Sequence, residues 1–350
     1  MSNKIQISKK NYRVGVLTGG GDCPGLNAVI RAIVRRGRQL GLTIIGIKEG
    51  WKGLVDGRAG ILTEKVVSEI LPLGGTILGS SRTNPFKVEG GPAKVLSNFK
   101  KLRLAALITI GGDDTLGVAK KLLKSIPVIG VPKTIDNDLI GTDFCIGFQT
   151  AVGIAREAVD RLHSTAESHN RVMILEVMGR NFGWIATYAG LAGGADYILI
   201  PEIPIDIEKV CQSIQARVKR GKRFSIIVVA EGAKLKEGKI VTKTGEKDVF
   251  GHERLGGIGD VMANLIKEKT GIDSRAANLG HILRGGTPDH FDRILATRLG
   301  VKAIEMVAKK EFGKAVILKG NQIKALSLSQ IKGGRAIDRE IYRIAEIFFD

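Results

Sequence analysis

The sequence predicts an α/β protein with two domains, each built on a parallel sheet that is covered by helices. Apolar, β-branched runs alternate with helical patterns over most of the chain, which is typical of parallel sheets with crossover helices. A length of 350 residues is sufficient for two separate cores. The 46 glycines gather where predicted strands end, as expected where the backbone approaches a phosphate closely.

The first part of the chain repeats a strand–helix–strand pattern. In the helix predicted at 27–40, Ile30, Ile33 and Val34 recur at helical spacing, with arginines between them. The other predicted elements up to residue 131 are strands at 14–18, 43–47, 105–110 and 127–131, and a helix at 115–123.

The same alternation continues after residue 148. Segment 232–252 interrupts it with five lysines, four glycines and few apolar residues, so we expect a loop there. The predicted strands are 172–177, 197–200 and 225–230, and the predicted helices are 149–164, 182–191, 207–220, 253–269, 291–309 and 339–349.

The composition restricts the partners that the protein can have. Lysine and arginine total 54 against 35 acidic residues, a net charge of +19 that favours nucleic acid, an anionic membrane or a multiply phosphorylated small molecule. No apolar run reaches the roughly 18 residues that span a membrane. Aromatic residues are only 5% and none lies within the basic cluster 217–223, which argues against nucleic acid and favours a solvated helix end. Three widely spaced cysteines predict free thiols in a reducing cytoplasm.

The segment 132–138 carries two carboxylates and an ammonium directly after a buried strand. Pro132 has no N–H to donate, so it ends the strand and projects Lys133, Asp136 and Asp138 at the carboxyl edge of a sheet. Ligands bind at that edge in open α/β sheets. On the local sequence alone, a solvated turn whose Asp-Asn-Asp caps a helix is equally compatible.

Two glycine-rich junctions indicate phosphate and metal binding. Residues 19–27 follow the first strand and open the first helix, where glycines such as Gly21 let backbone N–H groups face an anion. Residues 111–115 repeat that arrangement with Asp113 and Asp114, and Asp113 suits Mg²⁺, which takes carboxylate and phosphate oxygens. The alternatives are a tight strand-to-helix turn at the first junction and a capping aspartate at the second.

Several arginines lie in predicted loops at strand ends. Arginine binds phosphate through two parallel hydrogen bonds, so such a set suits a phosphorylated substrate. Glu231 follows a predicted strand and could accept hydrogen bonds from sugar hydroxyls, whereas the default for His281 is a partly buried imidazole with a hydrogen-bond partner. The arginines are Arg82, Arg171, Arg180, Arg275 and Arg284.

Together, these motifs in this order resemble the phosphofructokinase family over roughly residues 14–300. The specific blocks are Thr-Ile-Asp-Asn-Asp at 134–138, Met-Gly-Arg at 178–180 and His-Ile-Leu-Arg at 281–284. The resemblance implies phosphoryl transfer to the 1-hydroxyl of fructose 6-phosphate in glycolysis or gluconeogenesis. It also implies a large domain at 1–147 with a return segment at 283–333, a small domain at 148–282 with 334–350, and an active site in the cleft between them.

The resemblance also assigns roles to individual residues. Asp136 matches the general base, supported by Asp138, and Asp113 matches the Mg²⁺ ligand. Gly21 and Arg82 match contacts to the donor phosphate, while Arg171 and Arg275 match arginines supplied by a neighbouring subunit, which implies a homodimer or homotetramer. The positions that match sugar-phosphate contacts are Thr134, Ile135, Asp136, Met178, Gly179, Arg180, Glu231, His281 and Arg284.

Asp114 and Lys133 bear on the phosphoryl donor. Members of the family that use ATP typically have glycine at both positions, and the pair present here is similar to the pyrophosphate-dependent branch. A carboxylate at Asp114 would repel the α-phosphate of ATP, and Lys133 adds positive charge for a donor that has no nucleoside. An ATP-dependent or dual-donor phosphofructokinase, and a non-catalytic protein that binds phosphometabolites or RNA, remain the alternatives. Sedoheptulose 7-phosphate remains open as a second acceptor.

Overall fold

The chain folds into two compact units. The structure, a computed structural model, describes residues 12–236, 242–247 and 253–349. Unit 1 comprises Met1–Thr150 with Arg284–Gly334, and unit 2 comprises Ala151–Leu283 with Arg335–Asp350. The resemblance implied domain boundaries at 147/148, 282/283 and 333/334. The predicted α/β class is confirmed in both units.

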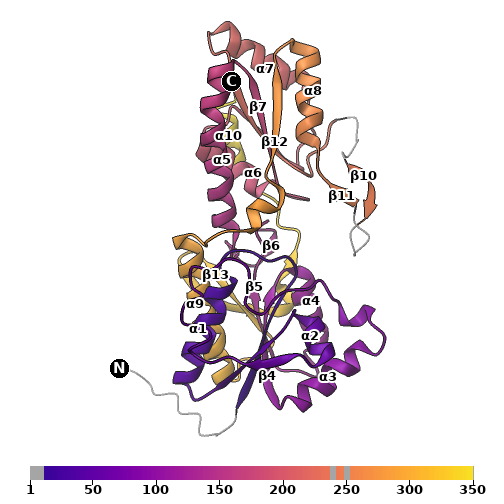
Figure 1. Ribbon diagram of the computed structural model, residues 1–350, viewed down its shortest axis with the longest axis vertical. Helices are drawn as coiled ribbons and strands as arrows, with labels where there is room; N and C mark the ends of the chain where they lie inside the picture. Colours follow the sequence, from indigo (N-terminus) through magenta and orange to yellow (C-terminus); the bar gives the residue numbers. More distant parts are fainter. Residues whose placement is uncertain (1–11, 237–241, 248–252, 350) are drawn as a thin grey trace. The chain divides into compact units, whose positions relative to one another are not determined.

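Unit 1 is built on a seven-stranded sheet with the order β14-β13-β5-β4-β1-β2-β3. Its strands β13, β5 and β4 are labelled in Figure 1. The five inner strands are parallel, as predicted, whereas β3 and β14 at the two edges pair antiparallel, which the sequence pattern did not indicate. Strand β14 follows β13 after the turn at Gly320, and a turn this short can join only antiparallel strands. The strands are β1 (Arg13–Gly19), β2 (Thr43–Ile47), β3 (Ala59–Ile61), β4 (Leu104–Gly111), β5 (Val128–Pro132), β13 (Lys314–Lys319) and β14 (Gln322–Ser327).

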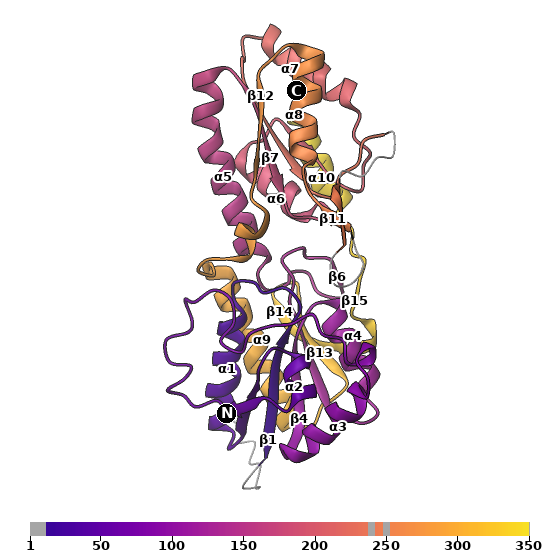
Figure 2. The same cartoon turned by 45° about the vertical axis from the view of Figure 1, so that its right-hand side comes forward.

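Helices cover both faces of this sheet (Figure 2). Helices α1 (Leu26–Gln39) and α9 (His290–Ala308) pack together on one face, where a Cβ at Gly300 would lie 2.7 Å from the Val29 carbonyl oxygen. The close approach of these two helices therefore requires glycine at that position. The other face is covered by α2 (Trp51–Asp56), α3 (Gly91–Lys101) and α4 (Asp113–Leu122), with Leu54, Val95 and Leu116 in their shared core. Short 3₁₀ helices lie at Pro85–Lys87 and Leu328–Gln330, and β6 (Leu139–Ile140) pairs with β15 (Lys332–Gly333).

Unit 2 is built on a four-stranded sheet, β12-β7-β9-β8, in which all pairings are parallel. The strands are β12 (Ser274–Asn278), β7 (Val172–Val177), β9 (Ser225–Ala230) and β8 (Tyr197–Leu199). Helices α7 (Ile207–Lys219) and α8 (Ile258–Thr270) share a core with one face through Ile214 and Met262. The remaining helices are α5 (Phe148–His169), α6 (Trp184–Gly193) and α10 (Arg339–Glu346).

Two sequence predictions need correction in unit 2. The loop expected at 232–252 contains β10 (Thr242–Lys247), which pairs antiparallel with β11 (Glu253–Leu255). Residues 237–241 and 248–252 of that segment lie outside the described residues. The helix expected from 253 begins only at Ile258, because Gly256 and Gly257 adopt φ values of 133° and 93°, which a helix excludes.

The basic cluster at 217–223 contains the end of a helix, as expected, but the expected exposure to solvent does not extend to Arg217. Helix α7 ends at Lys219, and Arg217 is buried, where its guanidinium pairs with Asp196 at 2.8 Å. The most buried arginine of the cluster therefore serves the fold of unit 2. None of the helices in the described part of the chain combines the length and the apolar character needed to span a membrane.

Asp292 fastens the start of α5 to α9 within unit 1. Its buried carboxylate accepts hydrogen bonds from the backbone N–H groups of Gly147 and Thr150, both at 2.9 Å, and from the Thr150 hydroxyl at 2.7 Å. Replacing one carboxylate oxygen with an amide N–H₂ removes an acceptor and leaves a buried donor unsatisfied. We therefore expect Asp292→Asn to lower the free energy of unfolding by about 1–3 kcal/mol in urea denaturation.

The matched control is Asp160→Asn on the exposed side of α5. Asp160 forms an i,i+4 ion pair with Arg156, and both side chains are exposed. Such pairs contribute only about 0.3–0.5 kcal/mol. An equal effect of the two substitutions would show that the buried carboxylate has no special role.

Candidate active site

Three of the predicted binding loops meet at one edge of the unit 1 sheet. The last residues of three neighbouring parallel strands stand in register, with Gly19 of β1 beside Gly111 of β4, and Gly111 beside Pro132 of β5. The segments that follow are the glycine loop 19–25, the acidic start of α4 and the loop 133–138. The carboxyl edge predicted for these motifs is therefore confirmed, and the phosphate-binding and acidic side chains lie on adjacent loops.

The loop 133–138 is part of the folded core and does not cap a helix. Ile135 and Asn137 are fully buried, and Asp138 is followed by strand β6. Asn137 has a φ of 52°, and its side-chain amide donates to the Asp143 carbonyl at 3.2 Å while accepting from the Cys145 N–H at 2.9 Å. The alternative of a solvated helix cap is therefore wrong, because a side chain at the centre of the loop fixes its conformation.

Burial raises the pKa of both acidic side chains of this loop. It raises the pKa of Asp136 above its ordinary value of 3.8, although Arg284 and Lys133 act to lower it. It raises the pKa of Asp138 to about 6, with a further contribution from the charge of Asp136. The Thr134 hydroxyl accepts from the Asp136 N–H at 3.1 Å and holds the turn. A carboxylate whose pKa is raised is a better proton acceptor, which suits a general base.

Lys133 places a buried positive charge in the glycine loop. Its side chain is 3% exposed, and its ammonium donates a hydrogen bond to the Gly21 carbonyl oxygen. Its backbone N–H donates to Gly111 O at 3.1 Å, so the residue links all three loops. Burial lowers the pKa of Lys133, and the charge of Asp136 acts against that shift. A desolvated cation at this position is suited to stabilise phosphate oxygens.

Arg284 lies against the glycine loop. A Cβ at Gly21 would lie 2.7 Å from Arg284 Nη1, and that nitrogen donates to Asp22 O at 3.3 Å. Glycine at position 21 therefore makes room for the guanidinium. The structure thus brings together, within unit 1, a residue predicted to contact the donor and one predicted to contact the sugar phosphate.

The acidic pair at the start of α4 does not cap the helix. The N-cap residue is Gly112, with no side-chain hydrogen bond, and Asp113 and Asp114 occupy the exposed first turn. The capping alternative is therefore wrong. Among the residues that the structure describes, no group of three His, Cys, Asp or Glu side chains could enclose a metal. A single exposed carboxylate fits Mg²⁺, which keeps several waters and takes its other ligands from substrate phosphates.

The loop that carries Arg82 lies beside the glycine loop. The N–H of Gly20 donates to Ser81 O at 3.0 Å, and the Ser80 hydroxyl donates to Gly20 O. Arg82 itself is exposed. The two segments that were predicted to contact the donor are therefore neighbours in unit 1.

The predicted sugar-phosphate residues of unit 2 gather at the carboxyl edge of its sheet. Gly179 follows β7 with a φ of 149°, and its carbonyl accepts from Gly232 N–H at 3.1 Å. The N–H of Glu231, which follows β9, donates to Val177 O at 2.9 Å. Met178, Arg180 and the exposed His281 follow the ends of β7 and β12 at the same edge.

Arg171 and Arg275 lie at the opposite edge of that sheet. Arg171 precedes β7 and Arg275 is the second residue of β12, and both pair with Asp273, at 2.6 Å from Arg171 Nε and 3.4 Å from Arg275 Nη2. Six residues of β7 separate this edge from Met178, or about 20 Å at 3.3 Å per residue. Within one chain, therefore, these arginines do not bind the same phosphate as Met178 and Arg180.

Some residues that shape the site were not identified from the sequence. Thr18 and Asn27 are buried, and their side chains hold the segment 73–79 that leads to Arg82. Glu49 holds the same loop from another side. The only signal in the sequence was the position of Asn27 at the end of the glycine motif.

The chain belongs to the phosphofructokinase family, whose profile, described as "Phosphofructokinase", matches residues 13–307. A "Pyrophosphate--fructose 6-phosphate 1-phosphotransferase" from Amycolatopsis methanolica is 54% identical over 340 residues, covering 96% of this chain and 99% of that protein. An "ATP-dependent 6-phosphofructokinase" from Corynebacterium efficiens is 51% identical over 324 residues, covering 92% and 94%.

A solved structure supports the same membership. The phosphofructokinase of Saccharomyces cerevisiae superposes with a TM-score of 0.80 at 31% identity. The match covers 91% of this chain and 45% of the yeast chain, so the present chain spans less than half of that larger protein.

Proposed function

We propose that the protein transfers a phosphoryl group from pyrophosphate to the 1-hydroxyl of fructose 6-phosphate, giving fructose 1,6-bisphosphate and phosphate. The observation that carries the proposal is the buried Lys133 ammonium in the glycine loop, accompanied by the Asp114 carboxylate in the first turn of α4. The Amycolatopsis relative, named for this reaction, supports it. The similarity to a relative named as ATP-dependent keeps ATP as the second candidate donor.

In the proposed mechanism, Asp136 accepts the proton of the sugar hydroxyl as that oxygen attacks the phosphoryl group. Lys133 and Arg180 stabilise the negative charge that the transition state spreads over the phosphoryl oxygens, and Arg82 binds the donor phosphate. Asp113 would hold Mg²⁺, which supplies neutralising charge to the two phosphates when bound. His281, Arg284 and the partner's arginines orient the sugar phosphate, so that the hydroxyl is presented to the donor.

The placement of Arg171 and Arg275 supports a site that two subunits share. Arg171 lies about 20 Å along β7 from Met178, and Arg275 stands in register with Met173 near the same amino end of the sheet. Their shared carboxylate, Asp273, neutralises only one of the two charges, which leaves a net positive group for a phosphate bound by another copy. We therefore propose a homodimer or homotetramer as the active form.

Mixing two inactive variants tests this sharing. In a mixture of Asp136→Asn and Arg275→Ala chains, one site of each mixed pair combines an intact Asp136 with the partner's intact Arg275. Random pairing makes about half of the pairs mixed, so activity should return to about a quarter of the wild-type value. Each variant alone should stay strongly impaired, and the absence of any recovery in verified mixed pairs would contradict sharing.

The chemistry of the donor and of the cysteines bears on the direction of the reaction and on the compartment in which it takes place. Pyrophosphate and the product ester have similar transfer potentials, so the reaction should run in both directions and serve glycolysis or gluconeogenesis. The cysteines at 23, 145 and 211 are free and buried, which supports a reducing compartment such as the cytoplasm.

A coupled assay tests the proposed function. The purified protein is incubated with Mg²⁺, pyrophosphate and fructose 6-phosphate, and the bisphosphate formed is cleaved by aldolase and measured. Parallel reactions replace pyrophosphate with ATP, and fructose 6-phosphate with sedoheptulose 7-phosphate. Formation of the bisphosphate from pyrophosphate is expected, and its absence at all concentrations would refute the proposal.

A further inference from the structure

The segment 78–82, which ends at Arg82, lies between the glycine loop and the turn that contains Glu49. On one side, Gly20 N–H donates to Ser81 O at 3.0 Å. On the other, Glu49 N–H donates to Leu78 O at 2.8 Å, and Glu49 O accepts from the Ser81 hydroxyl at 2.7 Å. The backbone of Glu49 therefore fixes both ends of the short stretch that lines the glycine loop.

Glu49 can hold this stretch only in an uncommon backbone conformation. Its φ is 52°, in the left-handed region that residues with a side chain rarely occupy. Gly50 follows with a φ of 62°, and a Cβ at this position would lie 2.7 Å from Thr18 O at the end of β1. The turn is therefore pressed against the strand that leads into the glycine loop, so a change in the turn also reaches that loop.

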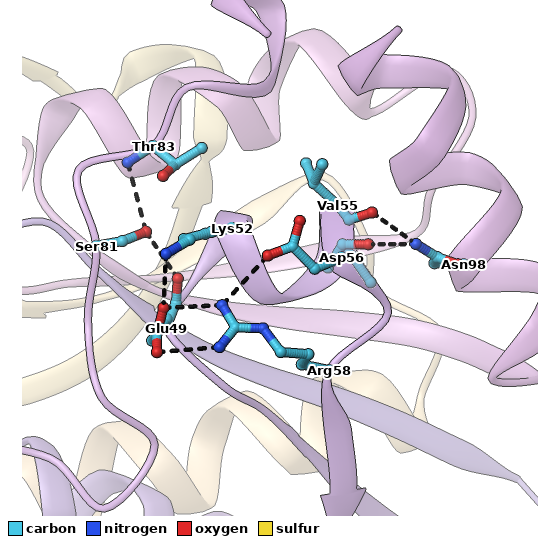
Figure 3. A network of polar contacts seen from close by, with 9 residues as sticks. Glu49, Lys52, Val55, Asp56, Arg58, Ser81, Thr83 and Asn98 are labelled. Carbon is cyan, nitrogen blue, oxygen red and sulfur yellow. Dashed lines mark hydrogen bonds and ion pairs between the residues drawn. The ribbon is translucent and has the colours of Figure 1, made fainter. Parts of the chain in front are cut away.

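The side chain of Glu49 holds this conformation through a bidentate ion pair with Arg58 (Figure 3). Arg58 Nη1 and Nη2 donate to the two carboxylate oxygens at 3.1 and 2.8 Å, and Lys52 adds a contact at 3.3 Å. The Arg58 guanidinium also contacts the Asp56 carboxylate at 3.2 Å. The backbone of Arg58 forms hydrogen bonds with Lys48 and Gly53. A two-point pair of this kind fixes orientation as well as distance.

The pair is not explained by a need for overall stability. Both side chains are exposed, at 42% for Arg58 and 38% for Glu49, and exposed ion pairs contribute little to the folded state. The hydrogen bonds with Arg58 and Lys52 lower the pKa of Glu49 to about 2, so the carboxylate stays charged at any pH suited to an enzyme assay. The pair holds a turn whose backbone is hydrogen-bonded to Leu78 and Ser81 of the segment 78–82.

We propose that Glu49 and Arg58 are positioning residues for the phosphoryl donor, because they hold the segment 78–82 and its Arg82 against the glycine loop. Neither residue touches a reacting atom in this scheme. The inference rests on the proposed function in one respect, which is that pyrophosphate binds at the glycine loop. It concerns affinity for the donor and leaves the chemical step and the sugar-phosphate site unchanged.

The test compares Glu49→Gln, Arg58→Gln and the double variant with the wild type. We expect each to raise the KM for pyrophosphate about three- to fivefold, a change of about 0.6–1 kcal/mol in binding, with kcat and the KM for fructose 6-phosphate within about twofold. The double variant should be no worse than either single one, because the two side chains act through one contact. Amide hydrogen exchange in the peptide covering 78–83 should become about three- to fivefold faster in all three.

Glu305→Gln is the matched control. It breaks another partly exposed pair of unit 1, with Arg36 at 2.7 Å between α1 and α9, and should change neither the KM for pyrophosphate nor exchange at 78–83. An unchanged KM in Glu49→Gln would overturn the proposal, and so would a loss spread equally over both substrates. If the wild type does not use pyrophosphate, the proposed function fails, while unchanged exchange at 78–83 would separately refute the positioning role.

Discussion

Asp136→Asn is expected to lower kcat by about 10²–10⁴-fold in both directions of the reaction. Asparagine has nearly the same shape, but it cannot accept the proton of the attacking hydroxyl. The surrounding loop should be retained, because Asn137, Ile135 and the Thr134 hydroxyl hold it independently of the carboxylate. The measurement is steady-state kinetics with varied fructose 6-phosphate, whose KM should stay within about twofold.

The pH dependence of the same reaction gives a second test of this base. Asp136 must be deprotonated to accept the proton in the direction of bisphosphate formation, so kcat should fall as pH decreases through its pKa. Burial raises that pKa, which moves the acidic limb above the ordinary value of 3.8. The limb should disappear in Asp136→Asn, and in the reverse direction the protonated group should be the active one. A loss of less than tenfold in kcat in the Asp136→Asn variant would show that another group is the base.

The double substitution Asp114→Gly with Lys133→Gly is expected to lower kcat/KM for pyrophosphate by about 10²–10³-fold. Removal of the Lys133 ammonium takes a desolvated positive charge out of the glycine loop, where it donates to Gly21 O. Removal of the Asp114 carboxylate also eliminates repulsion of a nucleotide α-phosphate, so the rate with ATP should rise relative to that with pyrophosphate.

The two single substitutions separate these effects. Lys133→Gly alone should account for most of the loss with pyrophosphate, whereas Asp114→Gly alone should mainly improve use of ATP. Fructose 6-phosphate serves as the control substrate, since neither residue is expected to change its KM by more than about twofold. An Asp114→Gly variant that gains nothing with ATP would show that other residues exclude the nucleotide.

The inner strands of both sheets, except β13, were predictable because their sequences are almost entirely apolar and β-branched. The predictions at 43–47, 172–177 and 225–230 coincide with β2, β7 and β9. The hairpin of β13 and β14 was missed, since β14 lies at the sheet edge and exposes most of its residues. Strand β10 was missed because its polar sequence forms a strand only by pairing with β11.

The order of the binding loops was also predictable, because parallel strands bring the segments that follow them to one edge. The contacts that hold those segments in place were not predictable, since they join residues far apart in the chain. Asn27 reaches residues about 50 positions away, and Glu49 binds a segment about 30 positions further on. The close approach of Arg284 to Gly21, across more than 250 positions, likewise follows only from the fold.

The most direct test of the central claim is the ratio of kcat/KM for pyrophosphate and for ATP in the unmodified protein, measured with saturating fructose 6-phosphate and Mg²⁺. A buried lysine in the glycine loop and a carboxylate at position 114 predict that pyrophosphate is preferred by about 100-fold or more, which corresponds to about 2.7 kcal/mol. A ratio at or below one would contradict the assignment of the donor.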